Sequence, residues 1–259
     1  MAADKEQVER SREEPDPTDF YAPMRDHFRM DPRRTDDESV NALLALARPD
    51  DVWLDVGAGG GRYALPLALH VKRLVAIDPS PSMLEALRED AAAEGITNTE
   101  TIETRWPMAD PPAGDVALMA HVGYDIAEIG PFLDQLEAQS RRLCVAVMGA
   151  SAMQTTGALF WRAVHGEERV RLPALPELLT LLLARGRLPE VTIVDRVPPT
   201  FDSLDDAMNT ARRQLWLRRG SARDEKLASL VRDVVTERDG HFAFEWTPTK
   251  IGIISWAPR

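Results

Sequence analysis

Two aspartates and the glycine-rich turn between them carry the clearest chemical signal in the sequence. Residues 52–62 read Val-Trp-Leu-Asp-Val-Gly-Ala-Gly-Gly-Gly-Arg, so that Asp55 lies two residues before Gly57. Glycines at alternating positions allow a tight turn and a close approach of the backbone to a ligand. A helix that begins just beyond the turn presents free N–H groups and a partial positive charge. The pattern predicts a ligand-binding turn between a buried strand and a helix.

A second acidic residue, Asp78, ends the apolar run 73–78. A carboxylate about twenty residues after such a turn can accept hydrogen bonds from both hydroxyls of a ribose. Asp55 argues against a pyrophosphate ligand, because its charge would repel phosphates and attract an ammonium or a sulfonium group. Arg62 occupies the sixth position counted from Gly57, where a dinucleotide motif needs a small residue. Together these residues favour a cationic nucleoside over NAD.

Three segments resemble the motifs of one protein family. Residues 54–61 and 76–84 resemble motifs I and II of the class I, S-adenosylmethionine-dependent methyltransferases. Residues 115–122 resemble the fourth strand of that family and the turn that faces the methyl acceptor. The resemblance extends over roughly residues 40–148 and suits the small-molecule type of enzyme. It implies S-adenosylmethionine as the cofactor and S-adenosylhomocysteine as the product, and it says little about the substrate.

The resemblance also implies which residues contact the cofactor. Asp55 and the backbone of 57–61 would lie near the methionine part, and Asp78 at the ribose. The loop after the third strand would border the adenine, where Trp106 could supply an apolar face or, equally well, anchor the core. Tyr21 belongs to an N-terminal segment that in this family often closes over the cofactor, with simple docking of the segment as the alternative. The full predicted set is Tyr21, Asp55, Gly57, Ala58, Gly59, Gly61, Asp78, Pro79, Met83, Arg105, Trp106, Ala120 and His121.

Methyl transfer from a sulfonium makes few demands on side-chain chemistry. It is an in-line displacement in which the cofactor supplies the leaving group, so the protein must mainly align acceptor, methyl carbon and sulfur. Carbon or unactivated hydroxyl acceptors can need a base, and the candidates are His121, Tyr124 and His165, none of them within a supporting motif. No metal site is expected, because the spacing of the available acids fits no metal-binding loop: Asp115, Asp125 and Glu128.

The composition limits the partners. The 259-residue chain has 31 basic and 42 acidic side chains and a formal net charge of −11, which disfavours a nucleic-acid substrate. Cys144 is the only cysteine, so no intramolecular disulfide can form. We find neither an apolar run of about eighteen residues, which a membrane span needs, nor the apolar core of a signal peptide. We therefore expect a cytoplasmic protein, monomeric or homodimeric, that acts on a small-molecule acceptor and neither binds nucleic acid nor enters a membrane.

Short apolar runs alternate with helical segments along much of the chain, which predicts an α/β fold. We expect a seven-stranded, mostly parallel, doubly wound sheet with helices on both faces. The first predicted strand begins at residue 52. The other six are residues 73–78, 100–103, 115–121, 143–148, 191–195 and 251–256. Residues 242–246 alternate in the manner of an edge strand.

Residues 19–259 are expected to form one domain. Residues 1–18 are charged and poor in large apolar groups, which predicts a disordered tail. The segments 151–187 and 201–238 are largely helical, and we expect them to roof an acceptor pocket. Three aromatic residues could line that pocket, although packing between lid and sheet is the favoured alternative for each: Trp161, Phe201 and Trp216.

The sequence thus predicts a methyltransferase that moves a methyl group from S-adenosylmethionine to oxygen, nitrogen or carbon of a small metabolite. An NAD-linked oxidoreductase of Rossmann fold and a non-catalytic, cofactor-binding regulatory protein remain as alternatives. Binding of S-adenosylhomocysteine without binding of NAD would exclude the oxidoreductase. Transfer activity on an acceptor panel would exclude the regulatory protein.

Overall fold

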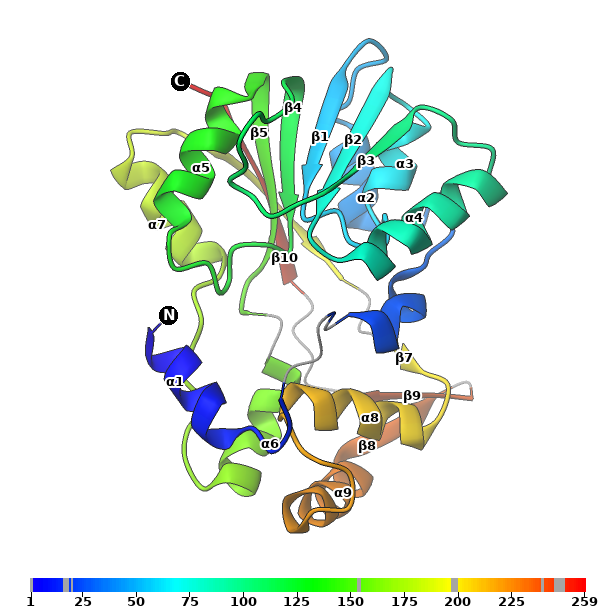
Figure 1. Cartoon of the computed structure of the whole chain (residues 1–259), viewed down its shortest axis with the longest axis vertical. Coiled ribbons are helices and arrows are strands. Elements are labelled where there is room, and N and C mark those ends of the chain that lie inside the picture. The colour runs from blue at the N-terminus through cyan, green and yellow to red at the C-terminus, as the bar shows by residue number, and fades with distance from the viewer. Residues whose placement is uncertain are drawn as a thin grey trace.

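The chain forms two lobes (Figure 1). The computed structural model describes residues 2–15, 19, 21–152, 155–196, 200–238, 240–244 and 250–259. One lobe contains a large sheet with helices on both faces, and the other contains a small sheet and several helices (Figure 1). Within the described residues, every helix is too short or too polar to cross a bilayer.

The large sheet has the strand order β3-β2-β1-β4-β5-β10-β6. Strand β10 pairs antiparallel with both of its neighbours, and the other strands all run in one direction. The strands are β1 (Val52–Val56), β2 (Arg73–Asp78), β3 (Thr99–Glu103), β4 (Gly114–Ala120), β5 (Ser140–Gly149), β6 (Glu190–Asp195) and β10 (Lys250–Trp256). The predicted α/β fold with a seven-stranded, mostly parallel sheet is confirmed. An antiparallel strand between β5 and β6 distinguishes this sheet from the 3-2-1-4-5-6 order of dinucleotide-binding domains.

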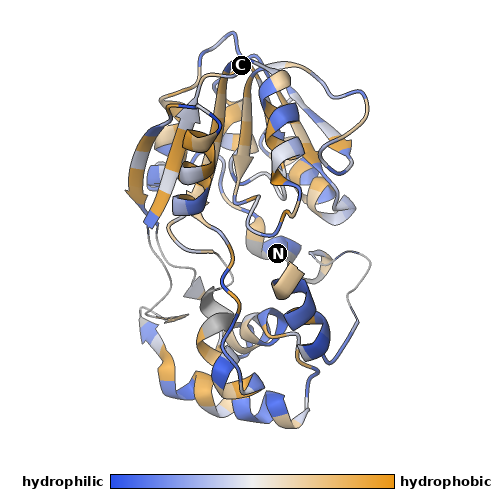
Figure 2. Ribbon diagram, turned by 90° about the vertical axis from the view of Figure 1, so that its left-hand side faces the viewer, coloured by the Kyte–Doolittle hydropathy of each residue, from blue (hydrophilic) through white to orange (hydrophobic). Residues whose placement is uncertain are grey.

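Helices cover both faces of the large sheet, which confirms the doubly wound arrangement. Helices α2 (Glu38–Leu44), α3 (Ala64–Ala68) and α4 (Pro81–Ala93) pack on one face. Helices α5 (Ile129–Ala138) and α7 (Leu175–Ala184) pack on the other. The strands between them are mostly hydrophobic (Figure 2), as expected for parallel strands that are buried on both sides.

The position of α7 corrects the predicted lid. Helix α7 belongs to the segment 151–187, yet it packs on the large sheet as part of its helical layer. Leu175, Leu178 and Leu182 form its buried stripe, and the side chain of Leu175 lies against the backbone of Gly252 in β10. Three leucines at helical spacing form an apolar face that can pack on a sheet. This face places α7 on the sheet, although its segment was expected to form a lid.

The second lobe has an apolar core of its own. Helices α6 (Thr155–His165), α8 (Leu204–Gln214) and α9 (Ala222–Val234) surround this core. Ser203 and Ser221 cap α8 and α9 through bonds from the N–H groups three residues later, as their Ser-x-x-Asp spacing indicates.

A small sheet completes the second lobe. Its order is β7-β9-β8, formed by β7 (Thr200–Phe201), β8 (Val235–Arg238) and β9 (His241–Phe244). The predicted edge strand at 242–246 is therefore corrected. Its described part is the central strand of this small sheet, and residues 245–249 lie outside the described residues.

The predicted disorder of residues 1–18 is wrong for residues 2–11, which form helix α1 (Ala2–Ser11). Buried polar contacts hold α1 on the loop after α6. Asp4 pairs with Arg169 at 2.5 Å, and Gln7 bonds the backbone of Glu168 and Val170. A charged composition indicates disorder only when its polar groups find no partners, and these partners lie more than 150 residues away in the sequence. Residues 1 and 16–18 lie outside the described residues.

Candidate cofactor and acceptor site

The glycine turn connects β1 to α3 beside the end of β2. The Gly57 N–H donates to the Ile77 carbonyl at 2.7 Å, which ties the turn to β2. Gly57, Gly59 and Gly61 have φ of 81°, 52° and 89°, in the region that favours glycine. A Cβ on Gly57 would lie 2.3 Å from Cγ2 of Val122, whereas a Cβ on Gly59 would meet no described atom within 4 Å. The turn is thus packed against the residues after β4 at Gly57 and open at Gly59.

Asp78 ends β2 directly beside this turn. Its Oδ2 accepts the Gly59 N–H at 2.9 Å, and its Oδ1 accepts the Ser80 N–H at 2.8 Å. Burial raises the pKa of Asp78, and the bonds from Ser80 and Gly59 oppose that effect. Each carboxylate oxygen has two lone pairs, so both can still accept a hydroxyl proton. Asp78 therefore has the position and the spare acceptors that a ribose contact requires.

Asp55 is the buried acid of β1, with 1% of the residue exposed. Among the described residues none forms a hydrogen bond with its Oδ1. Burial, together with the nearby charge of Asp78, raises the pKa of Asp55 to about 7. A buried carboxylate without a partner is unfavourable. A cationic ligand would remove that cost, so Asp55 and the open turn at Gly59 fit a nucleoside that carries ammonium and sulfonium charges.

The N-terminal segment lies beside the glycine turn. The 3-10 helix η1 (Ala22–Phe28) contacts α4, where Arg25 pairs with Glu85 at 2.9 Å. Phe28 lies over the turn, with its Cβ 3.4 Å from a Cβ built on Gly60. Burial of the Tyr21 hydroxyl and the charges of Asp125 and Asp78 raise the pKa of Tyr21. The segment thus lies where a lid over the cofactor would lie, and contact of Tyr21 with the cofactor stays a prediction.

His121 follows β4 in the left-handed region, with φ of 57°. Its Nε2 lies 3.1 Å from the Tyr63 hydroxyl, and its Nδ1 lies 3.4 Å from the Tyr124 hydroxyl. The Tyr124 oxygen accepts the Gly149 N–H at 2.7 Å, so its own proton is available for His121 Nδ1. We therefore assign the proton of neutral His121 to Nε2, from which it is donated to Tyr63.

The hydrogen-bond chain continues from Tyr63 to the start of α2. The Tyr63 hydroxyl lies 3.2 Å from Ser39 Oγ, and Ser39 donates to Asp37. Asp37 also accepts Arg62 at 3.0 Å and Arg34 at 3.3 Å. Burial would raise the pKa of Asp37, but Ser39 and the two arginines lower it to about 2. The chain therefore ends on an ionised carboxylate, and we call His121, Tyr63 and Tyr124 the β4-tip cluster.

The surroundings of His121 keep its imidazole neutral. Burial, together with the positive charges of Arg196 and Arg62, lowers the pKa of His121 to about 3. Tyr124 is also buried, which raises its pKa to about 12. Near neutral pH the imidazole of His121 therefore takes up no proton, and the hydroxyl of Tyr124 keeps its own. Their polar groups bond to each other, to Tyr63 and to Gly149, so both are fixed parts of the β4-tip cluster.

His165, the third candidate base, is not brought to the glycine turn. It ends α6 in the second lobe, where its Nε2 lies 3.1 Å from the Leu215 carbonyl and its ring lies 4.2 Å from that of Trp161. Burial and the charge of Arg223 lower the pKa of His165. These contacts indicate a packing residue of the second lobe.

The aromatic residues predicted for an acceptor pocket also pack inside the second lobe. Trp161 is fully buried and Phe201 is 5% exposed. Trp161 packs edge-on against Trp216 with ring centroids 6.0 Å apart, and Arg169 stacks on Trp161 at 4.5 Å. These aromatic residues thus pack in a core, which is the alternative that the sequence favoured. That core belongs to the second lobe, whereas packing between the lid and the sheet was expected.

The remaining predicted contacts divide by exposure. Ala58, Ala120 and Met83 are buried, and Met83 sulfur lies 3.7 Å from a Cβ built on Gly60. Pro79 and Arg105 are exposed. Trp106 anchors its loop to α5, because its Nε1 donates to the Phe132 carbonyl at 3.1 Å and its ring packs edge-on against that side chain.

Sequence reasoning missed Tyr63, Asp37 and Arg196 as site residues. Asp37 caps α2 through bonds from Ser39 and Val40. These three residues come from segments that are far apart in the sequence, and no motif spacing connects them. Only the strand order brings them to one edge of the sheet.

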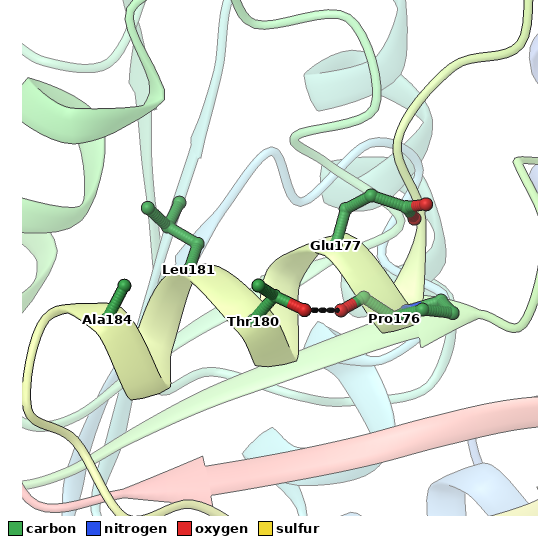
Figure 3. Close-up of a pocket in the computed structure, with 5 residues that line it drawn as sticks. All are labelled: Pro176, Glu177, Thr180, Leu181 and Ala184. Carbon is green, nitrogen blue, oxygen red and sulfur yellow. Dashed lines mark hydrogen bonds between the residues drawn. The ribbon is translucent and has the colours of Figure 1, made fainter.

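A hollow of about 410 Å³ runs along α7, away from the residues discussed above (Figure 3). Its lining residues are Pro176, Glu177, Thr180, Leu181 and Ala184. None of these belongs to the predicted cofactor site. Within the described part of the chain, His, Cys, Asp and Glu form no group of three or more that could hold a metal ion.

Residues 54–131, which include the glycine turn, Asp78 and β4, match the family model described as a methyltransferase domain. Over 94 residues, or 36% of its length, the chain is 30% identical to the "Probable ribosomal RNA small subunit methyltransferase A" of Methanosphaera stadtmanae. The chain spans about a third of that curated relative, 34% of its length.

Solved structures extend the likeness to most of the chain. The YcgJ protein of Bacillus subtilis superposes with a TM-score of 0.58 at 16% identity, covering 86% of this chain and 98% of that one. Magnesium protoporphyrin IX methyltransferase of Synechocystis with bound S-adenosylhomocysteine superposes with a TM-score of 0.54 at 11% identity, covering 85% of this chain and 82% of that one. The fold is that of the class I methyltransferases. The match of residues 54–131 to a methyltransferase domain and the shared fold agree with the resemblance found in the sequence.

Proposed function

We propose that the protein transfers a methyl group from S-adenosylmethionine to oxygen, nitrogen or carbon of a small molecule. One observation carries this proposal above the others. Asp55 is buried, has no partner for Oδ1 among the described residues, and lies in the strand that leads into an open glycine turn. A cationic ligand satisfies this carboxylate, whereas a pyrophosphate would meet its charge and that of Asp78.

Residues of this chain would hold the cofactor at both of its ends. Asp55 would face the methionine part, and Asp78 would accept the ribose hydroxyls while it keeps its bonds to Gly59 and Ser80. The bound cofactor supplies the activated methyl group and its leaving group. The remaining task is to orient the acceptor in line, and the β4-tip cluster lies beside the turn because Val122 packs on Gly57.

A small acceptor is favoured by the charge of the chain. With a formal net charge of −11, long-range electrostatics would repel an RNA backbone. The Methanosphaera relative is named for ribosomal RNA, and that activity belongs to a protein of which the chain spans about a third. The nature of the acceptor is therefore tested together with the transfer activity.

Isothermal titration tests the cofactor. We expect S-adenosylhomocysteine to bind and NAD to give no heat above dilution. Binding of NAD alone would overturn the proposal in favour of an oxidoreductase.

Transfer of labelled methyl tests the activity and the acceptor class. The protein is incubated with methyl-labelled S-adenosylmethionine and fractionated extract of the source cells. We expect label in acid-soluble small molecules. Label in a ribonuclease-sensitive precipitate would instead identify an RNA acceptor, and a lack of transfer to any fraction despite cofactor binding would indicate a regulatory protein.

A further inference from the structure

Strand β6 lies at one end of the strand order of the large sheet, and within the described residues no strand pairs with its outer edge. All of its residues are exposed except Val194, which is partly buried. The strand at the other end of the order, β3, reads Thr-Glu-Thr-Ile-Glu, and its two acidic side chains discourage pairing with a further strand. Strand β6 has acidic residues only at its two ends, so its middle offers an uncharged edge.

Two hydrogen bonds show which backbone groups of β6 point outward. The Asp195 N–H donates to Glu38 Oε2 at 3.0 Å, so it points away from β10. Lys250, which lies opposite Asp195, has its carbonyl bonded on the β5 side. Backbone groups alternate in direction along a strand, so Val191 and Ile193 share the outward direction of Asp195. Their N–H and C=O groups therefore form the open edge of the sheet.

The side chains of Val191 and Ile193 enlarge the apolar surface of this edge. They point to the sheet face that α5 and α7 cover, because the neighbouring Val194 packs into the core of the opposite face. Helix α7 lies over β10, where Leu175 contacts Gly252, and it leaves β6 uncovered. Val191 and Ile193 are accordingly 39% and 53% exposed.

The flank of α7 that faces β6 is apolar too. Arg185 pairs with Asp134 of α5, so the flank that carries Arg185 faces α5 (Figure 1). Leu183 lies on the opposite flank, toward β6, and is 56% exposed. Leu188, in the loop that leads into β6, is 88% exposed. We call these residues the β6 edge patch: Leu183, Leu188, Val191 and Ile193.

The middle of β6 is complementary to itself. When two copies of β6 pair antiparallel about a two-fold axis at Thr192, Val191 of each copy lies opposite Ile193 of the other. Each of these two pairs exchanges both of its N–H···O bonds, because the backbone groups concerned are those that point outward. The next pair would join Pro189, which has no N–H, to Asp195, whose N–H is already bound within the chain. The bonded ladder therefore ends where the outward groups end.

Charge and space also favour a second copy as the occupant of this edge. In the Thr192-centred register Glu190 lies opposite Val194, and Asp195 lies opposite Pro189, so no two acidic residues face each other. Because α7 lies over β10, three strand spacings, about 14 Å, would separate it from its counterpart. Two helices of about 10–12 Å diameter fit side by side at that distance, with Leu183 of each toward the joined edge.

The area of the β6 edge patch suits an interface between two copies. At the exposed fractions above, the four residues present on the order of 450 Å² per copy, about half of the ~800 Å² that each partner buries in a standard interface. The backbone edge of β6 and the polar residues at its two ends would add to this area. The patch thus forms the apolar centre of an interface with a polar rim.

We propose that two copies of this chain associate by antiparallel pairing of their β6 strands about Thr192, which joins their two large sheets into one. The inference goes beyond the proposed methyl transfer and does not depend on it. Because the paired strands run in opposite directions, the two glycine turns lie toward opposite ends of the joined sheet. Association therefore takes place away from both proposed cofactor sites.

Sedimentation of the full chain from about 1 to 100 μM tests the association. We expect the wild-type protein to become dimeric within this range. Ile193→Lys should raise the dissociation constant at least about ten-fold, because it places a charge opposite Val191 twice in the dimer. Leu159→Lys is the matched control, since Leu159 is a similarly exposed apolar residue, at 49%, in α6 of the second lobe. It should leave the dissociation constant unchanged, and far-UV circular dichroism shows that each variant is folded.

A cross-link tests the register. Thr192→Cys places two thiols opposite each other at the two-fold axis, where cross-strand Cβ atoms lie about 4.5–5.5 Å apart. The native Cys144 is buried and does not interfere. Mild oxidation should therefore give a covalent dimer of Thr192→Cys. Glu190→Cys is the control, because its two thiols would lie four residues apart along the joined strands, about 13 Å, and should not cross-link.

Three results would overturn the inference. A wild-type protein that stays monomeric at about 100 μM would do so, and it would leave the β6 edge to a strand of another protein. An equal effect of Ile193→Lys and Leu159→Lys would place the interface elsewhere. Equally rapid cross-linking of Thr192→Cys and Glu190→Cys would exclude the Thr192-centred pairing.

Discussion

Asp55→Asn removes a buried carboxylate and keeps the size of the side chain. Burial and the charge of Asp78 raise the pKa of Asp55 from 3.8 to about 7. Between these values the folded protein holds a proton that the unfolded chain has released, so the free energy of unfolding falls as pH rises. The rise in pKa corresponds to roughly 4 kcal/mol across that range. The contribution of Asp55 is therefore fully present below about pH 4 and lost as pH rises through about 7.

Urea denaturation without cofactor measures this effect from about pH 5 to pH 8. We expect the free energy of unfolding of the wild-type protein to fall over this interval relative to that of Asp55→Asn. The exposed Asp50 provides the control, and Asp50→Asn should retain the wild-type dependence. Parallel pH curves for the wild-type protein and Asp55→Asn would refute the reasoning. They would mean that the pKa of Asp55 is the same in the folded and the unfolded protein.

The same carboxylate should couple cofactor binding to proton release. A bound ammonium group favours the ionised form of Asp55, so binding of S-adenosylhomocysteine near pH 7 should release about half a proton. Calorimetry in buffers with different ionisation enthalpies measures that number. Asp55→Asn should bind at least about ten-fold more weakly and lose the proton release. Release that persists in the variant would assign the proton to another group.

Three further substitutions test other parts of the structure. Gly57→Ala should cost about 1–3 kcal/mol in the free energy of unfolding, because the new Cβ meets Val122 at a φ of 81°. Asp78→Ala should weaken S-adenosylhomocysteine binding by roughly 1.5–3 kcal/mol for each lost ribose bond, measured by titration. Asp4→Ala should release α1 by leaving Arg169 without its ion pair, so that proteolysis within residues 2–11 accelerates by about ten-fold or more.

Two of these substitutions have a matched control. Gly130→Ala, at a helical glycine where a Cβ would meet no described atom within 4 Å, should leave stability unchanged within about 0.5 kcal/mol. Glu9→Ala, at an exposed position of α1, should leave proteolysis unaffected. If Asp78→Ala kept full affinity, the ribose assignment would be wrong. Equal proteolysis of the Asp4→Ala and wild-type proteins would contradict the polar docking of α1.

The sheet and the glycine turn were predictable because their signals are local. An apolar run such as 73–78 can be satisfied only inside a sheet between helices, and the glycines at 57, 59 and 61 supply the positive φ values that the turn requires. Helix caps were predictable for the same reason. Ser80 accepts the Met83 N–H within one turn of helix, so its role is present in four consecutive residues.

Long-range polar contacts could not be predicted in this way. Helix α1 is held by Gln7 and by the pair of Asp4 with Arg169, and neither partner leaves a periodic pattern in the sequence. His121 was identified because it follows β4, but its neutral state results from burial and, next, from the charge of Arg196, 75 residues later in the chain. His165 was also a candidate base in the sequence, and the structure places it at the end of α6 in the second lobe.

The buried carboxylate of Asp55 gives the transfer a physical direction. A sulfonium cofactor would bring its positive charge toward Asp55 and compensate the cost of burying that carboxylate. Methyl transfer turns the sulfonium into a neutral thioether, and the charge that held the sulfur against Asp55 is then lost. Because Asp55 has a pKa of about 7, it can take up a proton once a cation leaves. Release of the spent cofactor thus restores the neutral, buried acid from which the next cycle begins.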